Sequence, residues 1–349
     1  MFIDPHVHFR DFNQWKKETV RHGLEVARDS GVDAVIDMPN TDPPILTEEL
    51  VARRLELARL ANVREVFYGL HMGLSNDMEQ VKRAVGIYNK FPQVVGMKLY
   101  AGHSVGNMGV VSVEDQEMVY ETLAREGFGG VLVVHAEKES GIKGKLWTPE
   151  IPVSHCLARP ESAEVESVAD QLRLLYITNF RGTLHFTHMT SPVAIGMIND
   201  KRMHGRSVSV GVCPHHLVYD WSQMNNEDGL IWKMNPPLRS PKTRNGLVTM
   251  LETGEIDSIE TDHAPHLLEE KTKHPFMSGI PGLPWWPVFE EYLRSQSLSD
   301  SQIEKLTFSS ARDRYGLDVE RTRREIFDRR KDYEFNPYSR VENDLGWAK

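Results

Sequence analysis

The chain has 349 residues, 40% of them hydrophobic, and it carries a formal net charge of −9 with a pI near 5.9. No block of Lys and Arg is present, which excludes nucleic acid and an anionic membrane surface as the main partner. The longest apolar runs are strand-sized and fall short of the roughly 18 residues that a membrane span requires. Two cysteines, Cys156 and Cys213, cannot form a disulfide framework, and no leader peptide stands out. We therefore expect a soluble protein of the reducing cytoplasm.

Short β-type runs alternate with amphipathic helical stretches along the whole chain. This alternation is typical of parallel strands joined by crossover helices, and eight strand–helix units favour an α/β fold, the (β/α)8 TIM-type barrel, over an open sheet. The expected strands lie near residues 1–8, 32–38, 65–72, 94–100, 130–136, 183–189, 207–213 and 257–262. The expected helices lie near residues 16–30, 46–61, 77–90, 114–126, 162–180, 191–204, 241–253 and 285–295.

The predicted domain organisation is one barrel followed by a tail. We expect the barrel domain over residues 1–315 and a charged C-terminal extension over 316–349 that packs on the barrel or is partly disordered. The exposed helices carry ordinary mixed charge, which does not decide the oligomeric state. A homodimer is kept as a candidate assembly.

The first strand ends in two histidines, His6 and His8, that are two residues apart. Side chains alternate between the faces of a strand, so both rings lie on one side and can converge on one metal ion. Arg10 follows on the same face and adds a fixed positive charge. Two interpretations compete at this point: a catalytic metal site that also holds an anionic substrate, and a polar strand end with two solvated histidines.

Four further strands place a ligand-type residue at or near their carboxyl ends, where barrels carry their chemistry. Lys98 interrupts the apolar strand near 94–100, while His135, His188 and Asp262 lie at the ends of strands five, six and eight. One such residue would be ordinary in a protein core. Five strands that deliver them to one end of a barrel favour the metal site.

The donor set indicates which metal and which bridge are needed. Four imidazoles and one carboxylate suit zinc or a similar first-row ion, whose catalytic sites keep a position open for water. Two ions about 3.5–4 Å apart would need a bridging ligand. Lys98 cannot bridge as an ammonium group, which only donates hydrogen bonds. Its neutral amine can react with carbon dioxide to give an anionic carbamate, and two nearby cations would offset the cost of deprotonating an amine of pKa about 10.4.

With these residues in place, the chain resembles the dihydroorotases of the amidohydrolase superfamily. Eight motifs match in the family's order and cover residues 4 to about 283. They are Asp4-Pro5-His6-Val7-His8-Phe9-Arg10, Met38-Pro39-Asn40-Thr41, Gly96-Met97-Lys98-Leu99-Tyr100, His135-Ala136-Glu137, Cys213-Pro214-His215-His216-Leu217, Lys233-Met234-Asn235-Pro236-Pro237-Leu238-Arg239, Thr261-Asp262-His263-Ala264-Pro265-His266 and Gly279-Ile280-Pro281-Gly282-Leu283.

The resemblance implies reversible hydrolysis of L-dihydroorotate to N-carbamoyl-L-aspartate, a step of pyrimidine (UMP) synthesis. It also implies that Asp262 takes the proton of the attacking hydroxide and passes it to the leaving ring nitrogen. The metal ligands that it implies are His6, His8 and Asp262 for one zinc ion, His135 and His188 for a second, and carboxylated Lys98 between the two. The substrate contacts that it implies are Arg10 and Asn40 at the carboxylate, His266 beside it, Asn235, Pro281 and Gly282 at the pyrimidine ring, and Ser104 above the substrate.

Two other functions stay open at this point. A related cyclic amidase, a hydantoinase or an allantoinase, would share the metal ligands, but a neutral ring substrate does not need both Arg10 and Asn40. A silent barrel that serves as a scaffold for another pyrimidine-pathway enzyme should have lost ligands, and here all six are present. Three further histidines receive no role in the chemistry: His263 is expected to face away from Asp262 and to be structural, and His215 and His216 are left unassigned.

Overall fold

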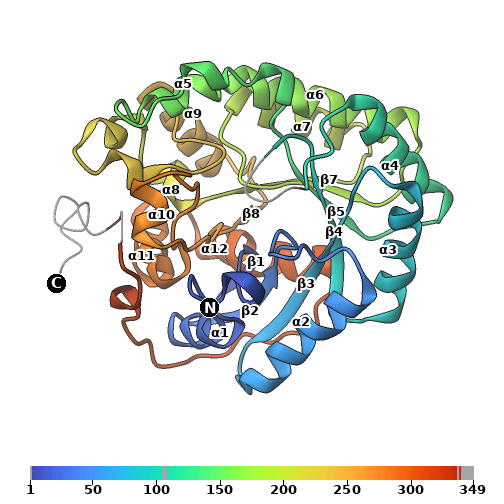
Figure 1. Cartoon of the computed structure of the whole chain (residues 1–349), viewed down its shortest axis with the longest axis horizontal. Helices are drawn as coiled ribbons and strands as arrows, with labels where there is room; N and C mark the ends of the chain where they lie inside the picture. Colours follow the sequence, from blue (N-terminus) through green and yellow to red (C-terminus); the bar gives the residue numbers. More distant parts are fainter. Residues whose placement is uncertain (1, 104–107, 336–337, 339–349) are drawn as a thin grey trace.

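The fold is a barrel of eight parallel strands, in a computed structural model that covers residues 2–103, 108–335 and 338. The strands pair in chain order, each hydrogen-bonded to the next. Figure 1 shows them at the centre of the molecule with helices around them, which confirms the predicted (β/α)8 barrel. The strands are β1 (Phe2–Val7), β2 (Val32–Asp37), β3 (Phe67–Gly73), β4 (Val94–Tyr100), β5 (Val131–His135), β6 (Thr183–Phe186), β7 (Val208–Val212) and β8 (Ser258–Ile259).

The long helices fall where the apolar periodicity predicts them, and shorter helices lie in the connections between them. No helix among the described residues is both long and apolar enough to cross a membrane. The long helices are α1 (Val20–Asp29), α2 (Glu48–Ala61), α3 (Met78–Lys90), α4 (Val113–Arg125), α6 (Glu161–Ile177), α7 (Pro192–Met203), α9 (Pro241–Glu252) and α11 (Trp286–Ser295). The short ones are α5 (Ser154–Ala158), α8 (Pro214–Val218), α10 (Leu268–Thr272), α12 (Asp300–Glu304) and α13 (Ser310–Tyr315), with a π-helical turn at Lys305–Ser309 between the last two.

Local sequence explains why the helices begin where they do. Thr47, Ser112 and Ser191 precede α2, α4 and α7, and the hydroxyl of each accepts a hydrogen bond from a backbone N–H of the first turn. Such caps satisfy donors that have no partner within the helix. Pro192 then occupies the first position of α7, where its missing N–H costs nothing.

The barrel closes through contacts beyond β8, because that strand has only two residues. The backbone N–H of His8 donates to the carbonyl of His263 at 2.7 Å. The backbone N–H and the hydroxyl of Thr261 donate to the two carboxylate oxygens of Asp4, at 3.0 and 2.6 Å. These bonds join the end of the chain's last strand to β1, so His8 and Asp262 are brought to the same edge of the barrel.

Apolar side chains fill the end of the barrel where the strands begin. Ile3, Val95 and Val131 lie at or next to the first residue of their strands, and they belong to one buried cluster with Phe308 of the π-helical turn. Burying this set removes water from one end of the barrel. The polar residues are thereby gathered at the opposite end, where the strands finish.

The first part of the predicted C-terminal extension lies against the barrel as far as the structure describes it. The N–H of Phe327 donates to the carbonyl of Asp29 at 2.9 Å, and the Tyr333 hydroxyl donates to Glu18 at 2.7 Å. Figure 1 shows this red segment passing α1. The division into a domain over 1–315 and an extension over 316–349 stays a prediction.

One buried arginine holds the segment that follows β1. Arg54 of α2 is fully buried and donates to the Asp37 carboxylate, to the Tyr68 hydroxyl at 3.1 Å and to the carbonyls of Phe9 and Arg10. A buried guanidinium needs this many acceptors, because an unpaired charge in the interior is costly. Arg54 therefore fixes the backbone that carries the predicted substrate residue.

We predict that Arg54→Met lowers the free energy of unfolding by about 3–5 kcal/mol, because it leaves the buried Asp37 carboxylate without its cation. Urea unfolding followed by circular dichroism measures the change. Arg59→Met is the matched control on the same helix: Arg59 pairs with Glu56 on the exposed surface, so its removal should change little. A loss below about 1 kcal/mol for Arg54→Met would contradict this role.

Candidate metal centre

The structure brings three predicted ligands from β1 and the segment after β8 to one point. The Nε2 atoms of His6 and His8 lie 3.2 Å apart, and Asp262 Oδ1 lies 2.9 Å from His8 Nε2 and 3.4 Å from His6 Nε2. All three residues are buried, and they form a group that could hold a metal ion. Ligand atoms at the corners of a tetrahedron around zinc are about 3.3 Å apart, given bonds of 2.0–2.1 Å. The spacing observed here fits such an ion.

The other nitrogen of each ring shows which atoms remain for the metal. His8 Nδ1 donates to Asn40 Oδ1 at 2.6 Å, and His6 Nδ1 is bonded to the hydroxyl of Thr187. Burial lowers the pKa of both histidines, that of His6 far below its usual value, so both rings are neutral. With the protons on Nδ1, both Nε2 lone pairs point at the Asp262 carboxylate. Three such electron pairs repel one another unless a cation lies between them.

Two more predicted ligands, His135 and His188, form a second pair. His135 Nδ1 and His188 Nε2 are 3.1 Å apart, and the His188 ring lies 5.2 Å from the ring of His6. Burial lowers the pKa of both rings, so they too are neutral. The Nε2 of His135 lies 3.2 Å from Glu137, which Arg159 holds from its other side. Glu137 therefore lies on the Nε2 side of the His135 ring, and the Nδ1 side faces His188.

Lys98 lies near both groups without a conventional partner. Its Nζ is fully buried and has no hydrogen-bond partner among the described residues, and it lies 5.1 Å above the ring of Tyr100. Burial lowers its pKa to about 7, despite the opposing charges of Glu260 and Asp262. Burying the charged ammonium form of a lysine without a partner costs free energy, so the neutral amine is favoured here. The neutral amine is the form that carbamate chemistry requires.

The backbone is strained at two of the predicted ligands. His188 has a φ of 43° and Asp262 a φ of 48°, a region that side chains other than glycine rarely adopt. Such strain costs on the order of 1–3 kcal/mol per residue and concentrates at functional sites. It also explains why Asp262 lies beyond the two residues of β8 and not within a regular strand.

The anion-binding side of the site centres on Arg10. Its Nε donates to the carbonyl of Pro265 at 3.1 Å, and its Nη2 lies 3.1 Å from His266 Nε2. His266 Nε2 also lies 3.0 Å from the carbonyl of Ser278. Burial and the neighbouring Arg10 hold the pKa of His266 well below its usual value, so the ring is neutral. His266 thus contacts Arg10, the predicted clamp for the substrate carboxylate. It is not among the residues that line the cavity around His6 and His8.

The remaining predicted substrate residues do not all line the same cavity. Asn235 lines the cavity, and its Oδ1 lies 3.0 Å from His155 Nε2. Gly282 lines a neighbouring small cavity, and Pro281 lines neither. Ser104 lies outside the described residues. The cavity itself is lined by His6, His8, Arg10, Asn40, Tyr100, His135, His188, Asn235, Asp262, Ala264, Ser278 and Gly279.

Sequence reasoning missed several residues that shape this site. Tyr100 lines the cavity, and Thr187, Glu260 and His155 bond to predicted site residues. The strand pattern held a signal for Glu260, an acid two residues before Asp262 in an otherwise buried run. Nothing in the pattern marked the other three. His263 is structural as expected, since it is buried against Glu18.

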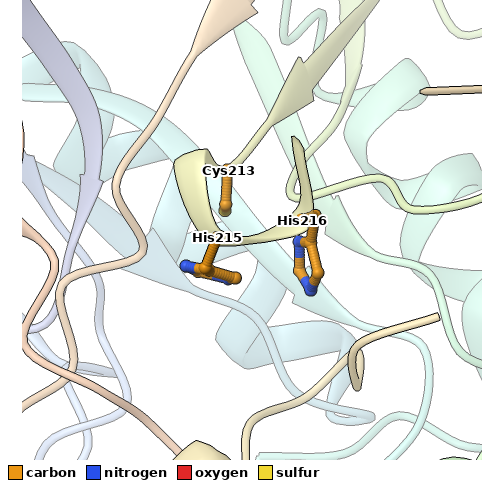
Figure 2. A group of neighbouring side chains, drawn as sticks. All are labelled: Cys213, His215 and His216. Atoms are coloured by element: carbon orange, nitrogen blue, oxygen red, sulfur yellow. The ribbon is translucent and has the colours of Figure 1, made fainter. Parts of the chain in front are cut away.

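The described residues include a second group of metal-type side chains, Cys213, His215 and His216. Figure 2 shows these residues close together: Cys213 directly precedes α8, and His215 and His216 lie within that short helix. The two rings pack edge to face with centroids 4.2 Å apart, His215 Nδ1 lies 3.3 Å from the Tyr338 hydroxyl, and His216 Nε2 donates to the Pro236 carbonyl at 3.0 Å. These contacts tie α8 to the connection that holds Pro236 and to Tyr338 near the C-terminus.

Comparison of the sequence with known proteins gives relatives that share one name. No family model matches the chain. Over 335 residues it is 30% identical to the dihydroorotase of Methanosarcina mazei, covering 91% of this chain and 70% of that protein. It is 32% identical over 292 residues to the dihydroorotase of Aeropyrum pernix, covering 82% and 62%. It is also 32% identical over 285 residues to the dihydroorotase of Listeria monocytogenes serotype 4b, covering 77% and 61%.

Comparison of the fold gives neighbours with related names. The L-hydantoinase (dihydropyrimidinase) of Arthrobacter aurescens matches with a TM-score of 0.79 at 22% identity, over 94% of this chain and 74% of that one. The dihydropyrimidinase of Brevibacillus agri matches with a TM-score of 0.77 at 21% identity, over 91% and 71%. At these identities the likeness shows a shared barrel fold.

We predict that a divalent ion stabilises this protein through the first group of ligands. Zinc added to chelator-treated protein at about 100 times its Kd should raise the free energy of unfolding by about 2.7 kcal/mol, measured as a thermal shift. His8→Asn should reduce that shift, because it removes one of three converging ligands. Cys213→Ser should retain it. The opposite pattern in the two variants would place the ion at the second group.

Proposed function

The chain belongs to the dihydroorotase family of cyclic-amide hydrolases, and from that premise we propose that it interconverts L-dihydroorotate and N-carbamoyl-L-aspartate in pyrimidine synthesis. The reaction breaks the ring C–N bond, forms a C–O bond at the carbonyl carbon and places a proton on the freed nitrogen. The chain must therefore hold a small anion, supply a nucleophile from water and move one proton. Each of these tasks has a candidate residue in the cavity described above.

The observation that carries the proposal is a buried arginine that lacks an anionic partner. Arg10 is only 1% exposed, yet its hydrogen bonds among the described residues go to a carbonyl and a neutral imidazole, and no described carboxylate pairs with it. Burial lowers its pKa, which reflects the cost of keeping this charge inside the protein. A substrate carboxylate would supply the missing charge with bidentate geometry. Dihydroorotate carries such a carboxylate, whereas a hydantoin ring does not.

We further propose two zinc ions, with His6, His8 and Asp262 holding one and His135 and His188 the other. Carboxylated Lys98 would lie between them, since its buried and unpaired amine is the group that carbamate formation would satisfy. When bound, such ions lower the pKa of water toward neutrality and polarise the carbonyl group. The unpartnered Nζ of Lys98 and the lone pairs that converge from His6, His8 and Asp262 support this assignment.

Asp262 is the proposed proton carrier. Its Oδ1 faces the two Nε2 atoms of His6 and His8, which leaves the second oxygen of the carboxylate for the proton of the attacking water. The strained backbone at Asp262 holds the carboxylate in the cavity. The same oxygen would then deliver the proton to the leaving ring nitrogen, as one group can serve as base and acid in turn.

Two asparagines complete the proposed substrate site. Asn40 accepts from His8 through Oδ1, so it orients a metal ligand in addition to its expected contact with the substrate carboxylate. Asn235 is oriented by His155 at the wall of the cavity and would face the ring amide. The cytoplasmic location and the homodimer expected from the sequence stay predictions.

The alternative of a hydantoinase or an allantoinase draws support from the solved structures that share the fold. The unpaired Arg10 argues against a neutral substrate, because that charge would stay buried without a partner. The scaffold alternative is disfavoured by the complete set of six ligand residues at the strand ends.

We expect Asp262→Asn to lower kcat for dihydroorotate by about 10²–10⁴-fold, because the amide cannot accept the proton. Metal content should fall less than kcat, since the amide oxygen can still face a cation. Spectrophotometric turnover and elemental analysis measure the two quantities. Near-normal turnover in the variant would disprove the role, and Asp300→Asn, an exposed acid on α12, is the control for the substitution itself.

The carboxylate clamp is tested by Arg10→Met. Loss of a charge-assisted hydrogen-bond pair worth about 1.5–3 kcal/mol should reduce kcat/KM for dihydroorotate by about 10–100-fold. The reduction should be much smaller for dihydrouracil, which has the same ring without the carboxylate. Equal losses on both substrates, or a parent enzyme that prefers hydantoin or allantoin, would favour the cyclic-amidase alternative.

A further inference from the structure

Glu260 is a fully buried carboxylate that touches neither cavity nor solvent. It follows β8 directly, and its backbone N–H donates to the carbonyl of Val212 at 3.0 Å. None of the roles above uses it. A charge at such depth persists only where it accepts several hydrogen bonds.

Three groups from β6 and its continuation donate to this one carboxylate. The Thr187 hydroxyl donates to Oε1 at 2.6 Å, and the backbone N–H of His188 donates to the same oxygen. His185 Nε2 lies 3.3 Å from Oε2, while its Nδ1 is bonded to the Ser209 hydroxyl at 2.9 Å. The carboxylate therefore organises a stretch that ends in one of the candidate metal ligands.

The count of protons at Thr187 determines the tautomer of His6. A threonine hydroxyl has a single proton, and here it is directed at Glu260. The contact between the Thr187 hydroxyl and His6 Nδ1 must then be donated by the ring. His6 consequently carries its proton on Nδ1, and its Nε2 is left with a lone pair that faces His8 and Asp262.

The same carboxylate acts on the second ligand pair through the backbone. His188 has the left-handed φ of 43°, and its N–H is fixed by Glu260. That bond compensates part of the strain and sets the direction in which the ring leaves the chain. Gly211 on β7 provides the room, because a Cβ there would overlap with the Glu260 carboxylate.

We propose that Glu260 is a positioning residue for both halves of the metal centre: through Thr187 it fixes the tautomer of His6, and through the backbone N–H it fixes the orientation of His188. The inference rests on the proposed function only in taking His6 and His188 as metal ligands. The inference predicts that the affinity for zinc depends on Glu260 and Thr187, although neither side chain contacts the ion. Partners that orient a metal-binding histidine are typically worth about 10–100-fold in metal affinity.

The experiment measures the zinc dissociation constant of the purified full chain by competition with a chromophoric chelator. Thr187→Val replaces the hydroxyl with a methyl group of similar size and should weaken zinc binding about 10–100-fold. Thr187→Ser retains the hydroxyl and should restore the parent affinity. Thr183→Val at the start of β6 is the matched control: it removes a hydroxyl that is bonded only to Ser207 among the described residues, and it should leave zinc affinity unchanged.

Glu260→Ala tests the carboxylate directly and should weaken zinc at least as much as Thr187→Val. Because it leaves buried donors without a partner, it can prevent folding, and Thr187→Val then carries the test alone. A merely structural role would lower the melting temperature of the metal-free protein without changing zinc affinity. If folded Thr187→Val binds zinc within twofold of a zinc-binding parent, this inference is wrong and the proposed function stands. A parent that binds no zinc overturns both.

Discussion

The structure depends on one electrostatic constraint: electron pairs that face one another in a buried place need a positive charge between them. Neutral His6 and His8 direct their Nε2 atoms at each other and at the Asp262 carboxylate within 3.4 Å, and the rings of His135 and His188 contact each other close by. Lys98 lies near these groups, yet burial lowers its pKa to about 7 and its Nζ bonds to none of the described residues. The protein itself therefore does not balance this arrangement, and a bound metal ion would.

Holding such a repulsive set together requires support from the rest of the barrel. The apolar packing at the start of the strands gives a rigid base, and the bonds of Thr261 to Asp4 close the barrel where β8 is too short to do so. Arg54 fixes the chain after β1. The left-handed backbone at His188 and Asp262 is the visible cost of aiming these side chains inward, and it is tolerated because the surrounding hydrogen bonds leave few alternatives.

Much of this could be predicted from the sequence, for a physical reason. Strand ends and helices follow from periodic burial, which is a local property, so the expected strand near 94–100 matches β4 and the helix near 46–61 differs from α2 by two residues at its start. His6, His8 and Asp262 were predictable as a group because strands of a barrel converge at one end. Glu260 stood out as an acid in a buried run, but its link to His6 through Thr187 was not predictable, since it depends on a hydrogen-bond chain between strands far apart in sequence. The bond between Asn40 and His8 escaped for the same reason.

The guanidinium of Arg10 and the candidate metal centre place a joint requirement on the ligand that enters the cavity. Arg10 is buried beside the candidate metal centre, and like charges in one cavity raise each other's cost. The arginine is nevertheless held in place by a carbonyl, a neutral imidazole and the backbone contacts of Arg54. A ligand with a carboxylate at one end and a cyclic amide at the other would satisfy both groups. Its anion would pair with Arg10, and its carbonyl oxygen would face the metal. A neutral ring would satisfy only the metal and would leave the charge of Arg10 unpaired. With a metal ion bound, charge separation across the cavity would thus select for an anionic cyclic amide.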